Sequence, residues 1–510
     1  MDYRLAVLAL AACRFGGGGS AGATANFTWT AGIRPTSPQV RWIDVKCSEP
    51  CAATATWDGG AREISSLQPA GSHALRLLGL LPGHAGLVEL ELTDADGAVL
   101  VETVLPLATE PLPAFFPDIT VTRPTEGPLE PGLTLIAPTA LTGAEVLLLI
   151  DDAGIVRWRA DVGPQVLLGM VWQPEQERVL ATRLDGKLIA VDLDGNLTPV
   201  WSPEPLLSEG EVAVDATRFS HDLAVDAAGD LVTFDEVPEI RASFPGDYGD
   251  GSVVLVDEPV IATRVVTFDA SGAVLRAVDV GAQLDPDRLA YDALAFSEGA
   301  RDWLHANAIQ AQDDGSLLLS LRHQDALVQL GPDGEIAWIA APLLNWSAPW
   351  DALLLQPTTD FDWFYHQHGP ELLDDGTLVV FDNGPVRSSP GEPSPQVPRH
   401  SRVVQYHVDP VAMTIREDWA WEPADGPVYS PIMGGVRRLP ATGNTLATFG
   451  FIERIAEVRL AESGLGDKAV RVVELSPARD VVWQLEMSAP ATVSPEGWHA
   501  YMAYRIPPLW

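Results

Sequence analysis

A weak repeat over residues 135–510 constrains the fold more than any other feature of the sequence. Each unit contains a turn with Asp and Gly, then an apolar strand, and often a second strand that ends near a Trp. The six units begin near Leu141, Leu167, Phe219, Leu304, Gln367 and Met433. Helical periodicity is almost absent, which predicts an all-β chain. Units of roughly 40–60 residues favour a six-bladed β-propeller over a β-sandwich or a β-helix.

The first unit of this repeat is one strand short, and the far end of the chain offers a replacement. The stretch Tyr501–Arg505 is able to supply that strand and close the ring. Ahead of the repeat, residues 26–110 alternate apolar and polar side chains in short runs, which predicts a small N-terminal β-sandwich domain. Residues 111–134 are rich in proline, so we expect them to connect the sandwich to a propeller domain at 135–510.

Residues 1–25 carry the signals of an exported protein. A short apolar core is followed by Leu10-Ala11-Ala12-Cys13, which has the pattern of a bacterial lipoprotein cleavage box, and then by a Gly-rich tether. We expect Cys13 to be lipidated, which predicts a periplasmic or cell-surface protein that meets a membrane only through this anchor. The alternatives are an ordinary signal peptide or a misplaced start codon, because the segment is short and contains Asp2.

Cys47 and Cys51 are the other two cysteines of the chain. The turn-forming spacer Ser-Glu-Pro is able to bring their side chains within bridging distance, and export favours a disulfide over two thiols. A metal site would need further ligands near this pair, and the sequence offers none there.

The charge balance excludes one class of partner. The chain has 32 Lys and Arg against 70 Asp and Glu, a formal net charge of −38, and no basic stripe compensates it. Such a surface repels phosphate backbones, so we expect no nucleic-acid partner. We also expect no cofactor. A homodimer is compatible with the sequence, which fixes no oligomeric state.

Polar residues recur at one register position of three successive units. Eight residues before the turn glycines Gly229, Gly315 and Gly376 stand His221, Asn307 and His368. The innermost strand of each propeller blade lines the central channel, so we expect these side chains to face a shared pocket. His305 lies two residues before Asn307, and strand alternation predicts that it points to the same side. A single histidine is more often structural, but convergence at equivalent positions favours a functional site.

Arg322 ends the strand that follows Asn307 in the same unit. A lone arginine is usually a solvated cation. In an acidic chain and beside a histidine cluster, a guanidinium is also suited to bind an oxyanion such as sulfate or phosphate through paired hydrogen bonds. Aromatic residues flank both histidine segments, as in DWLH and FDWFYHQH, and predict walls for a flat ring.

These segments carry a resemblance to a known family. DWLHAN, the following SLRHQ, and QH ahead of a strand that ends FDNG resemble the bacterial arylsulfate sulfotransferases, over about residues 110–505. The resemblance implies a six-bladed propeller that transfers a sulfuryl group from an aryl sulfate to a phenolic acceptor, without a nucleotide sulfate donor. It implies His368 as the nucleophile that becomes sulfated, with His305, Asn307, Arg322 and His221 as supporting residues of the site.

Details of the family are not all transferable. Its best-known members have a disulfide near the nucleophile, whereas Cys47 and Cys51 lie in the N-terminal domain, and an extra histidine, His366, precedes His368. Either His305 or His221 would move the proton of the phenol. Two other functions stay open: a propeller hydrolase or lactonase with a channel metal, although the register positions contain no carboxylate, and a non-catalytic binding propeller on the cell surface.

Overall fold

The structure is a computed structural model. It describes residues 28–33, 37–57, 62–68, 71–140, 145–247, 254–288, 296–297, 299–385, 399–454, 467–488 and 497–509. Within these ranges the secondary structure consists of β-strands and short 3-10 helices, so the predicted all-β class is confirmed. Cys13 lies outside the described residues. In the described part, no helix has the length and apolarity that a membrane crossing requires.

Residues 28–108 form two antiparallel sheets in the described part of the chain. The first contains β1 (Thr28–Ile33), β2 (Arg41–Cys47) and β5 (Gly71–Leu77). The second contains β4 (Arg62–Gln68), β3 (Cys51–Trp57), β6 (Ala85–Asp94) and β7 (Val99–Ala108). Buried side chains alternate along β2 and β3, and apolar residues of both sheets share one core. This alternation is the pattern that the sequence shows.

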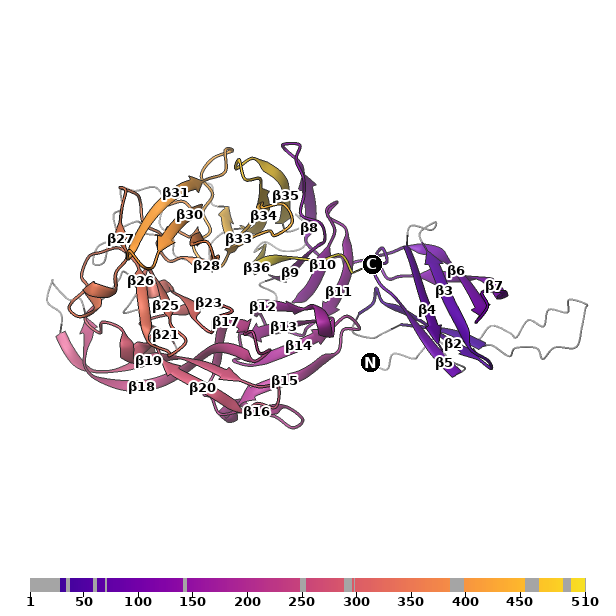
Figure 1. The fold of residues 1–510 in the computed structure, drawn as a ribbon, viewed down its shortest axis with the longest axis horizontal. Coiled ribbons are helices and arrows are strands. Elements are labelled where there is room, and N and C mark those ends of the chain that lie inside the picture. The colour runs from indigo at the N-terminus through magenta and orange to yellow at the C-terminus, as the bar shows by residue number, and fades with distance from the viewer. Residues whose placement is uncertain are drawn as a thin grey trace, which may run out of the picture.

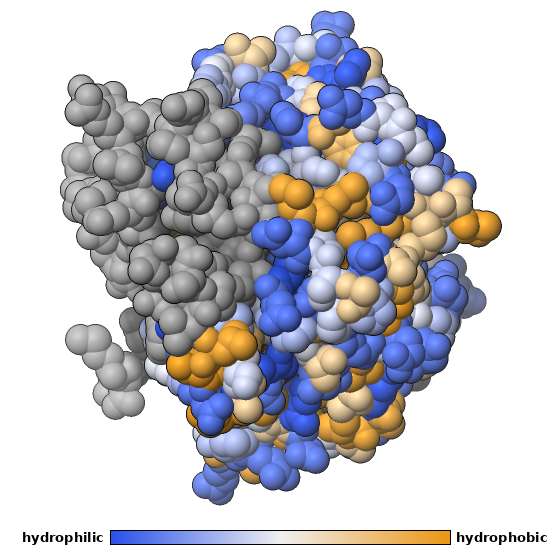
Figure 2. Space-filling model, turned by 90° about the vertical axis from the view of Figure 1, so that its left-hand side faces the viewer, coloured by the Kyte–Doolittle hydropathy of each residue, from blue (hydrophilic) through white to orange (hydrophobic). Residues whose placement is uncertain are grey.

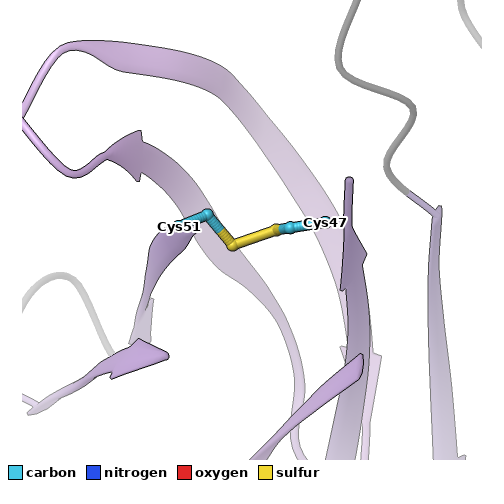
Figure 3. Close-up of a disulfide and its surroundings, with 2 residues drawn as sticks. All are labelled: Cys47 and Cys51. Atoms are coloured by element: carbon cyan, nitrogen blue, oxygen red, sulfur yellow. A yellow bond between two sulfur atoms is a disulfide. The ribbon is translucent and has the colours of Figure 1, made fainter. Parts of the chain in front are cut away.

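The predicted disulfide is present in this N-terminal region. The Sγ atoms of Cys47 and Cys51 are 2.02 Å apart (Figure 3). Cys47 ends β2 and Cys51 begins β3, so the bond links the two sheets at the turn between them. Both cysteines are buried in the shared core, far along the chain from the histidines.

Residues 118–506 form six further sheets among the described residues. The first two contain β36 (Trp498–Ile506), β9 (Leu133–Ala140), β10 (Val146–Ile150) and β11 (Val156–Asp161), then β12 (Leu167–Gln173), β13 (Arg178–Arg183), β14 (Leu188–Asp192), β15 (Leu197–Pro203) and β16 (Val212–Val214). The third contains β17 (Phe219–Val225), β18 (Leu231–Asp247), β19 (Val254–Phe268), β20 (Val274–Asp279), β21 (Phe296–Ser297) and β22 (Ala300–Arg301).

The other three sheets follow in chain order. The fourth contains β23 (Ala306–Ala311), β24 (Leu317–Leu321), β25 (Ala326–Leu330) and β26 (Ile336–Ala340). The fifth contains β28 (His368–Leu372), β29 (Thr377–Asp382), β30 (Arg402–Asp409), β31 (Thr414–Trp421) and β27 (Gln356–Pro357). The sixth contains β32 (Gly435–Arg438), β33 (Thr445–Arg454), β34 (Asp467–Leu475), β35 (Val481–Ser488) and β8 (Asp118–Thr122). The 3-10 helices are η2 (Pro174–Gln176), η3 (Glu204–Leu206), η5 (Gly281–Gln283), η6 (Arg322–Gln324) and η7 (Trp350–Leu353).

The six sheets surround a common centre (Figure 1). The first strand of each sheet contacts the first strand of the next, from β36 through β12, β17, β23, β28 and β32 and back to β36. The N-terminal sheets lie to one side of this body, where Gln39 Nε2 donates to the Val156 carbonyl oxygen at 3.0 Å. On the side of the body away from the N-terminal sheets, apolar side chains occur in small groups between hydrophilic ones (Figure 2).

The structure confirms one sequence expectation about this body and corrects two. The C-terminal strand β36 pairs with β9 and completes the first sheet, as predicted. That sheet begins at Leu133, not near Leu141. The sequence pattern missed this start because β9 is buried along its whole length and its side chains therefore show no alternation. The expected connector 111–134 is not only a connector, since it supplies β8, which pairs with β35 at the edge of the sixth sheet.

Candidate active site

The first strands of the six sheets, which contact one another around the common centre, are the innermost strands. Three of the predicted site residues lie where such strands begin. His221 is the third residue of β17, Asn307 the second residue of β23 and His368 the first residue of β28. Arg322 follows β24 and opens the 3-10 helix η6. The first strands of neighbouring sheets contact one another, and the rings of both His221 and His368 lie near the Tyr501 ring, so the structure brings these side chains together.

Several residues of this site have left-handed backbone conformations. The φ angles of His221, His305, His366 and Met433 are 51°, 45°, 53° and 61°. Such values are uncommon for residues other than glycine, and they concentrate at functional sites. They also correct one expectation. His305 does not share a strand with Asn307, since β23 begins at Ala306, and strand alternation therefore does not determine where His305 points.

His368 is buried, and both nitrogens of its ring have hydrogen-bond partners. Its Nδ1 lies 2.7 Å from Asn383 Oδ1 and 3.2 Å from the His366 carbonyl oxygen, and the Met433 main-chain N–H donates to its Nε2 at 3.2 Å. The Asn383 amide nitrogen donates to the carbonyl oxygens of Ser430 and Met433 at 2.7 and 2.8 Å. The amide oxygen of Asn383 therefore faces the ring, and this places the imidazole proton on Nδ1 and the lone pair on Nε2.

His305 has a charged partner instead. Its Nδ1 is hydrogen-bonded to the Asp302 carboxylate. The His305 ring lies 4.4 Å from the His323 ring and 4.5 Å from the His221 ring, centroid to centroid. The side chains of His305 and His221 are 22% and 20% exposed, so solvent reaches the site beside them.

His221 is positioned by a serine and a glutamate. Ser220 Oγ lies 2.5 Å from His221 Nδ1 and 2.5 Å from Glu236 Oε1. A serine hydroxyl that donates to the carboxylate accepts from His221 Nδ1, so the Nε2 lone pair of His221 points away from this pair. Burial, and then the positive charge of His305, lower the pKa of His221 to about 3. His221 is therefore neutral at neutral pH.

Asn307 and Tyr501 connect the strands that carry the site histidines. The Asn307 amide nitrogen donates to the Gln367 carbonyl oxygen at 2.8 Å, which links β23 to the residue before the predicted nucleophile. The Tyr501 hydroxyl donates to the Asn307 carbonyl oxygen. The Tyr501 ring lies 6.0 Å from His368 and 6.4 Å from His221, and burial raises the pKa of Tyr501 well above 10. Tyr501 is thus a neutral phenol between two strands of the site.

The electrostatics of the site keep further histidines neutral. Burial, and then the Arg322 guanidinium, hold the pKa of His368 well below 6.5. Burial, and then His305 and Arg322, lower the pKa of His323 well below 6.5. Burial alone would raise the pKa of the Asp302 carboxyl, but the charge and hydrogen bond of His305 hold it below its usual value. Asp302 is therefore the anion of the cluster.

His366, the extra histidine, has a different environment. It is fully buried, and its Nδ1 lies 2.9 Å from Asp325 Oδ1, which also accepts from the His366 main-chain N–H at 2.8 Å. A carboxylate that binds both the ring and the backbone fixes this residue within the protein.

Asp302, His305 and His323 bring one carboxylate and two imidazoles within 4.8 Å of one another, a donor set that suits zinc. The hydrogen bonds of His323 do not fit a metal ligand. Its Nε2 lies 2.5 Å from Arg322 Nη1, and its Nδ1 lies 2.5 Å from the Asp302 carbonyl oxygen. An arginine only donates and a carbonyl oxygen only accepts, so both ring nitrogens are engaged. The cluster therefore fits a hydrogen-bond network better than a metal centre.

A cavity of about 260 Å³ lies at the other end of the innermost strands. Late residues of these strands line it, including Val225, Ala311, Glu371, Arg437 and Tyr504. The histidines occupy the early residues of the same strands, so this cavity is separate from the cluster that contains Arg322.

Sequence reasoning missed the residues that position the predicted ones. Asp302 and Asn383 stand inside the DWLH and FDNG segments, so the sequence contained them, but nothing in it pairs Asn383 with a ring 15 positions earlier. Tyr501 lies in the closing strand that the sequence predicted, but the prediction gave this residue no role in the site. Its place in that strand was the available signal, because an innermost strand presents side chains to the central axis.

The fold and the site define an all-β protein with a buried histidine cluster beside an arginine. A model of the arylsulfotransferase (ASST) family matches residues 118–489. The chain belongs to the arylsulfotransferase family.

Two curated relatives are arylsulfate sulfotransferases. The enzyme AssT of Escherichia coli is 35% identical over 205 residues, which are 35% of this chain and 33% of the relative. AssT of Lelliottia amnigena is 36% identical over 202 residues, 34% of this chain and 33% of the relative. The chain thus matches about a third of the length of these relatives.

Solved structures also align with the chain. A protein of unknown function from Bacteroides caccae has a TM-score of 0.40 at 11% identity and covers 73% of this chain and 98% of its own. A virginiamycin B lyase from Staphylococcus aureus has a TM-score of 0.33 at 8% identity and covers 72% of this chain and 99% of its own.

Proposed function

We propose that this protein transfers a sulfuryl group from an aryl sulfate ester to a phenolic acceptor, through a sulfated His368 and without a nucleotide sulfate donor. Family membership and the two arylsulfate sulfotransferase relatives support the reaction class. One observation carries the mechanism: Asn383 orients His368 so that a neutral imidazole has its lone pair on Nε2. A neutral imidazole is a competent nucleophile near neutral pH.

The first half-reaction sulfates His368. The Met433 N–H, which donates to Nε2 in the resting site, must first release the Nε2 lone pair. That lone pair then forms a bond to sulfur while the bond between sulfur and the phenolic oxygen breaks, and the electron pair of the broken bond leaves on the phenolate. Arg322 binds the sulfuryl oxygens, whose charge it stabilises as an arginine does in phosphoryl transfer. His305 gives its Nε2 proton to the departing phenolate, while the Asp302 carboxylate holds the proton on His305 Nδ1. His368 keeps its Nδ1 proton, which donates to Asn383 throughout.

The second half-reaction reverses these roles with another phenol. His305, now neutral, takes the phenol proton as the phenolic oxygen bonds to sulfur, and the bond between sulfur and nitrogen breaks and returns its electron pair to Nε2. A nitrogen-bound sulfuryl group remains activated for such transfer. His221 is neutral and lies beside His305, so it acts as a hydrogen-bond partner in the pocket. This order of events requires ping-pong kinetics.

The same proposal includes the architecture and the location of the protein. The six sheets around a closed ring of contacting first strands support a six-bladed propeller, and the two N-terminal sheets with a shared core support a sandwich. We place the protein in the periplasm or on the cell surface, anchored by lipid at Cys13. Cys13→Ser should release it from the membrane fraction.

The test of the proposed function is turnover of 4-nitrophenyl sulfate with and without a second phenol. Sustained release of 4-nitrophenol that needs the acceptor, together with sulfated acceptor as product, is the expected result. Release that proceeds equally well with water alone would identify a hydrolase, and loss of that release on chelation would identify a metal enzyme. If no 4-nitrophenol is released with any phenolic acceptor, the result would favour a non-catalytic binding protein.

A further inference from the structure

His323 has no direct part in the reaction proposed above, yet it contacts the arginine of the site. The Arg322 guanidinium can only donate, and Nη1 lies 2.5 Å from His323 Nε2. On the other side of the ring, Nδ1 lies 2.5 Å from the Asp302 carbonyl oxygen, which can only accept. His323 is therefore a neutral imidazole with its proton on Nδ1, and its Nε2 lone pair accepts from the guanidinium.

The backbone around this pair is tied to the segment that carries His305. The main-chain N–H of Arg322 donates to the His305 carbonyl oxygen at 3.1 Å, and that of His323 donates to the Leu304 carbonyl oxygen at 3.1 Å. The Gln324 side chain donates to the Trp303 carbonyl oxygen at 2.9 Å. Three consecutive residues of η6 thus contact three consecutive residues before β23, which leaves the His323 ring little room to move.

Burial protects the acceptor role of this ring. His323 is 4% exposed, and the groups that face it are Arg322, the Asp302 carboxylate at 3.9 Å, and the rings of His305 and His366. Burial, and then His305 and Arg322, lower the pKa of His323 well below 6.5. A protonated ring would turn an N–H toward the guanidinium, so the neutral form is the one that is compatible with this contact.

We propose that His323 is a positioning residue, which fixes the direction of the Arg322 guanidinium so that its planar fork meets the sulfuryl oxygens of the donor. This inference rests on the proposed function, in which Arg322 binds those oxygens. An arginine side chain has many rotamers, and orienting it before the substrate arrives removes a cost of binding the transition state. Asp302 then serves two histidines, His305 through its carboxylate and His323 through its carbonyl oxygen.

The test is a double-mutant cycle between the two residues. His323→Phe keeps a ring and removes both nitrogens, so we expect kcat/KM for the aryl sulfate to fall roughly 30-fold, mainly in kcat. His323→Gln, whose amide oxygen reaches the place of Nε2, should recover roughly tenfold of that loss. In an Arg322→Lys background, His323→Phe should cost less than about twofold, since the residue acts through Arg322. His407→Phe, at a half-buried histidine of β30, is the matched control.

A second readout does not depend on turnover. Calorimetric titration with inorganic sulfate measures the same double-mutant cycle as a binding affinity. His323→Phe should bind sulfate more weakly than wild type, and the double variant should bind it no more weakly than Arg322→Lys alone. Additive effects in the titration, full activity of His323→Phe, or no rescue by Gln would overturn the inference. If wild type fails to transfer sulfuryl groups while the sulfate cycle is non-additive, the proposed function fails and the positioning role stands. If His323→Phe does not give a cooperative thermal melt, the cycle is completed with His323→Gln.

Discussion

The surroundings of His368 and His305 differ in one respect that separates their chemistry. His368 begins β28 and its Nδ1 meets the neutral amide of Asn383, whereas His305 precedes β23 and its Nδ1 meets the carboxylate of Asp302. An amide fixes a tautomer without adding charge, so the ring stays neutral and Nε2 is a nucleophile. A carboxylate holds the Nδ1 proton and leaves Nε2 to exchange a proton with a phenol, which suits an acid and base. Two histidines with one chemistry in solution therefore have separate roles in the protein.

Asp302→Asn should have the largest effect on the reaction, because it gives His305 an amide partner like that of His368. We expect kcat/KM to fall by roughly 10³ with unsubstituted phenyl sulfate, whose phenolate needs a proton to leave. With 4-nitrophenyl sulfate the loss should be smaller, since that phenolate leaves more easily without a proton. The measurement is the slope of log kcat/KM against the pKa of the leaving phenol. An equal loss for both donors would remove His305 from the proton-transfer step.

Arg322→Lys tests the guanidinium that binds the sulfuryl oxygens in both half-reactions of the proposed mechanism. A point charge does not reproduce the planar fork that binds two sulfate oxygens. Loss of one such donor should cost about 3 kcal/mol in the transition state, or ~100-fold in rate. Arg416→Lys, at an exposed position of β31, is the matched control. Near-wild-type turnover by a folded Arg322→Lys variant would place this side chain outside the contact with sulfate.

The pH dependence of His368 sulfation tests whether the His368 ring is neutral. A group with a pKa well below 6.5 remains unprotonated down to that lower pKa. With 4-nitrophenyl sulfate, whose phenolate depends least on a proton from His305, donor-alone sulfation should therefore change less than about twofold from pH 7 to 5.5. A histidine with the ordinary pKa would lose about tenfold over this range. Asn383→Asp adds a carboxylate beside Nδ1, which should raise the pKa of His368, so the sulfation rate of this variant should fall as the pH is lowered from 7 to 5.5. A wild-type acid limb near pH 6.5 would contradict the neutral environment.

The disulfide should have the smallest effect on the reaction. Cys47 and Cys51 lie in the N-terminal sheets, and neither contacts the histidine cluster. The loop they close is short, so a Cys47→Ser/Cys51→Ser variant should lose about 2 kcal/mol of stability and keep its turnover. Chemical denaturation and initial rates measure the two quantities. Lost turnover in a variant that remains folded would show that the pair contributes to catalysis.

The sequence predicted the positions of the site residues better than their partners. The register count placed His221, Asn307 and His368 at the starts of innermost strands, because the turn glycines set the distance along each strand. Asp302 and Asn383 are present in the quoted segments, but no sequence pattern indicates that their side chains bind His305 and His368. Their roles depend on side-chain contacts across turns, and on left-handed residues that strand alternation does not anticipate.

Incubation of the protein with aryl sulfate alone tests whether the sulfuryl group passes through His368. We expect rapid release of about one equivalent of phenol, a sulfuryl group on the peptide that contains His368, and discharge of that group by a phenolic acceptor. His368→Asn should abolish both the burst and the adduct, and a folded His366→Asn variant should retain them. An adduct on His366, or intersecting lines in a two-substrate analysis with no adduct at all, would contradict a mechanism through His368.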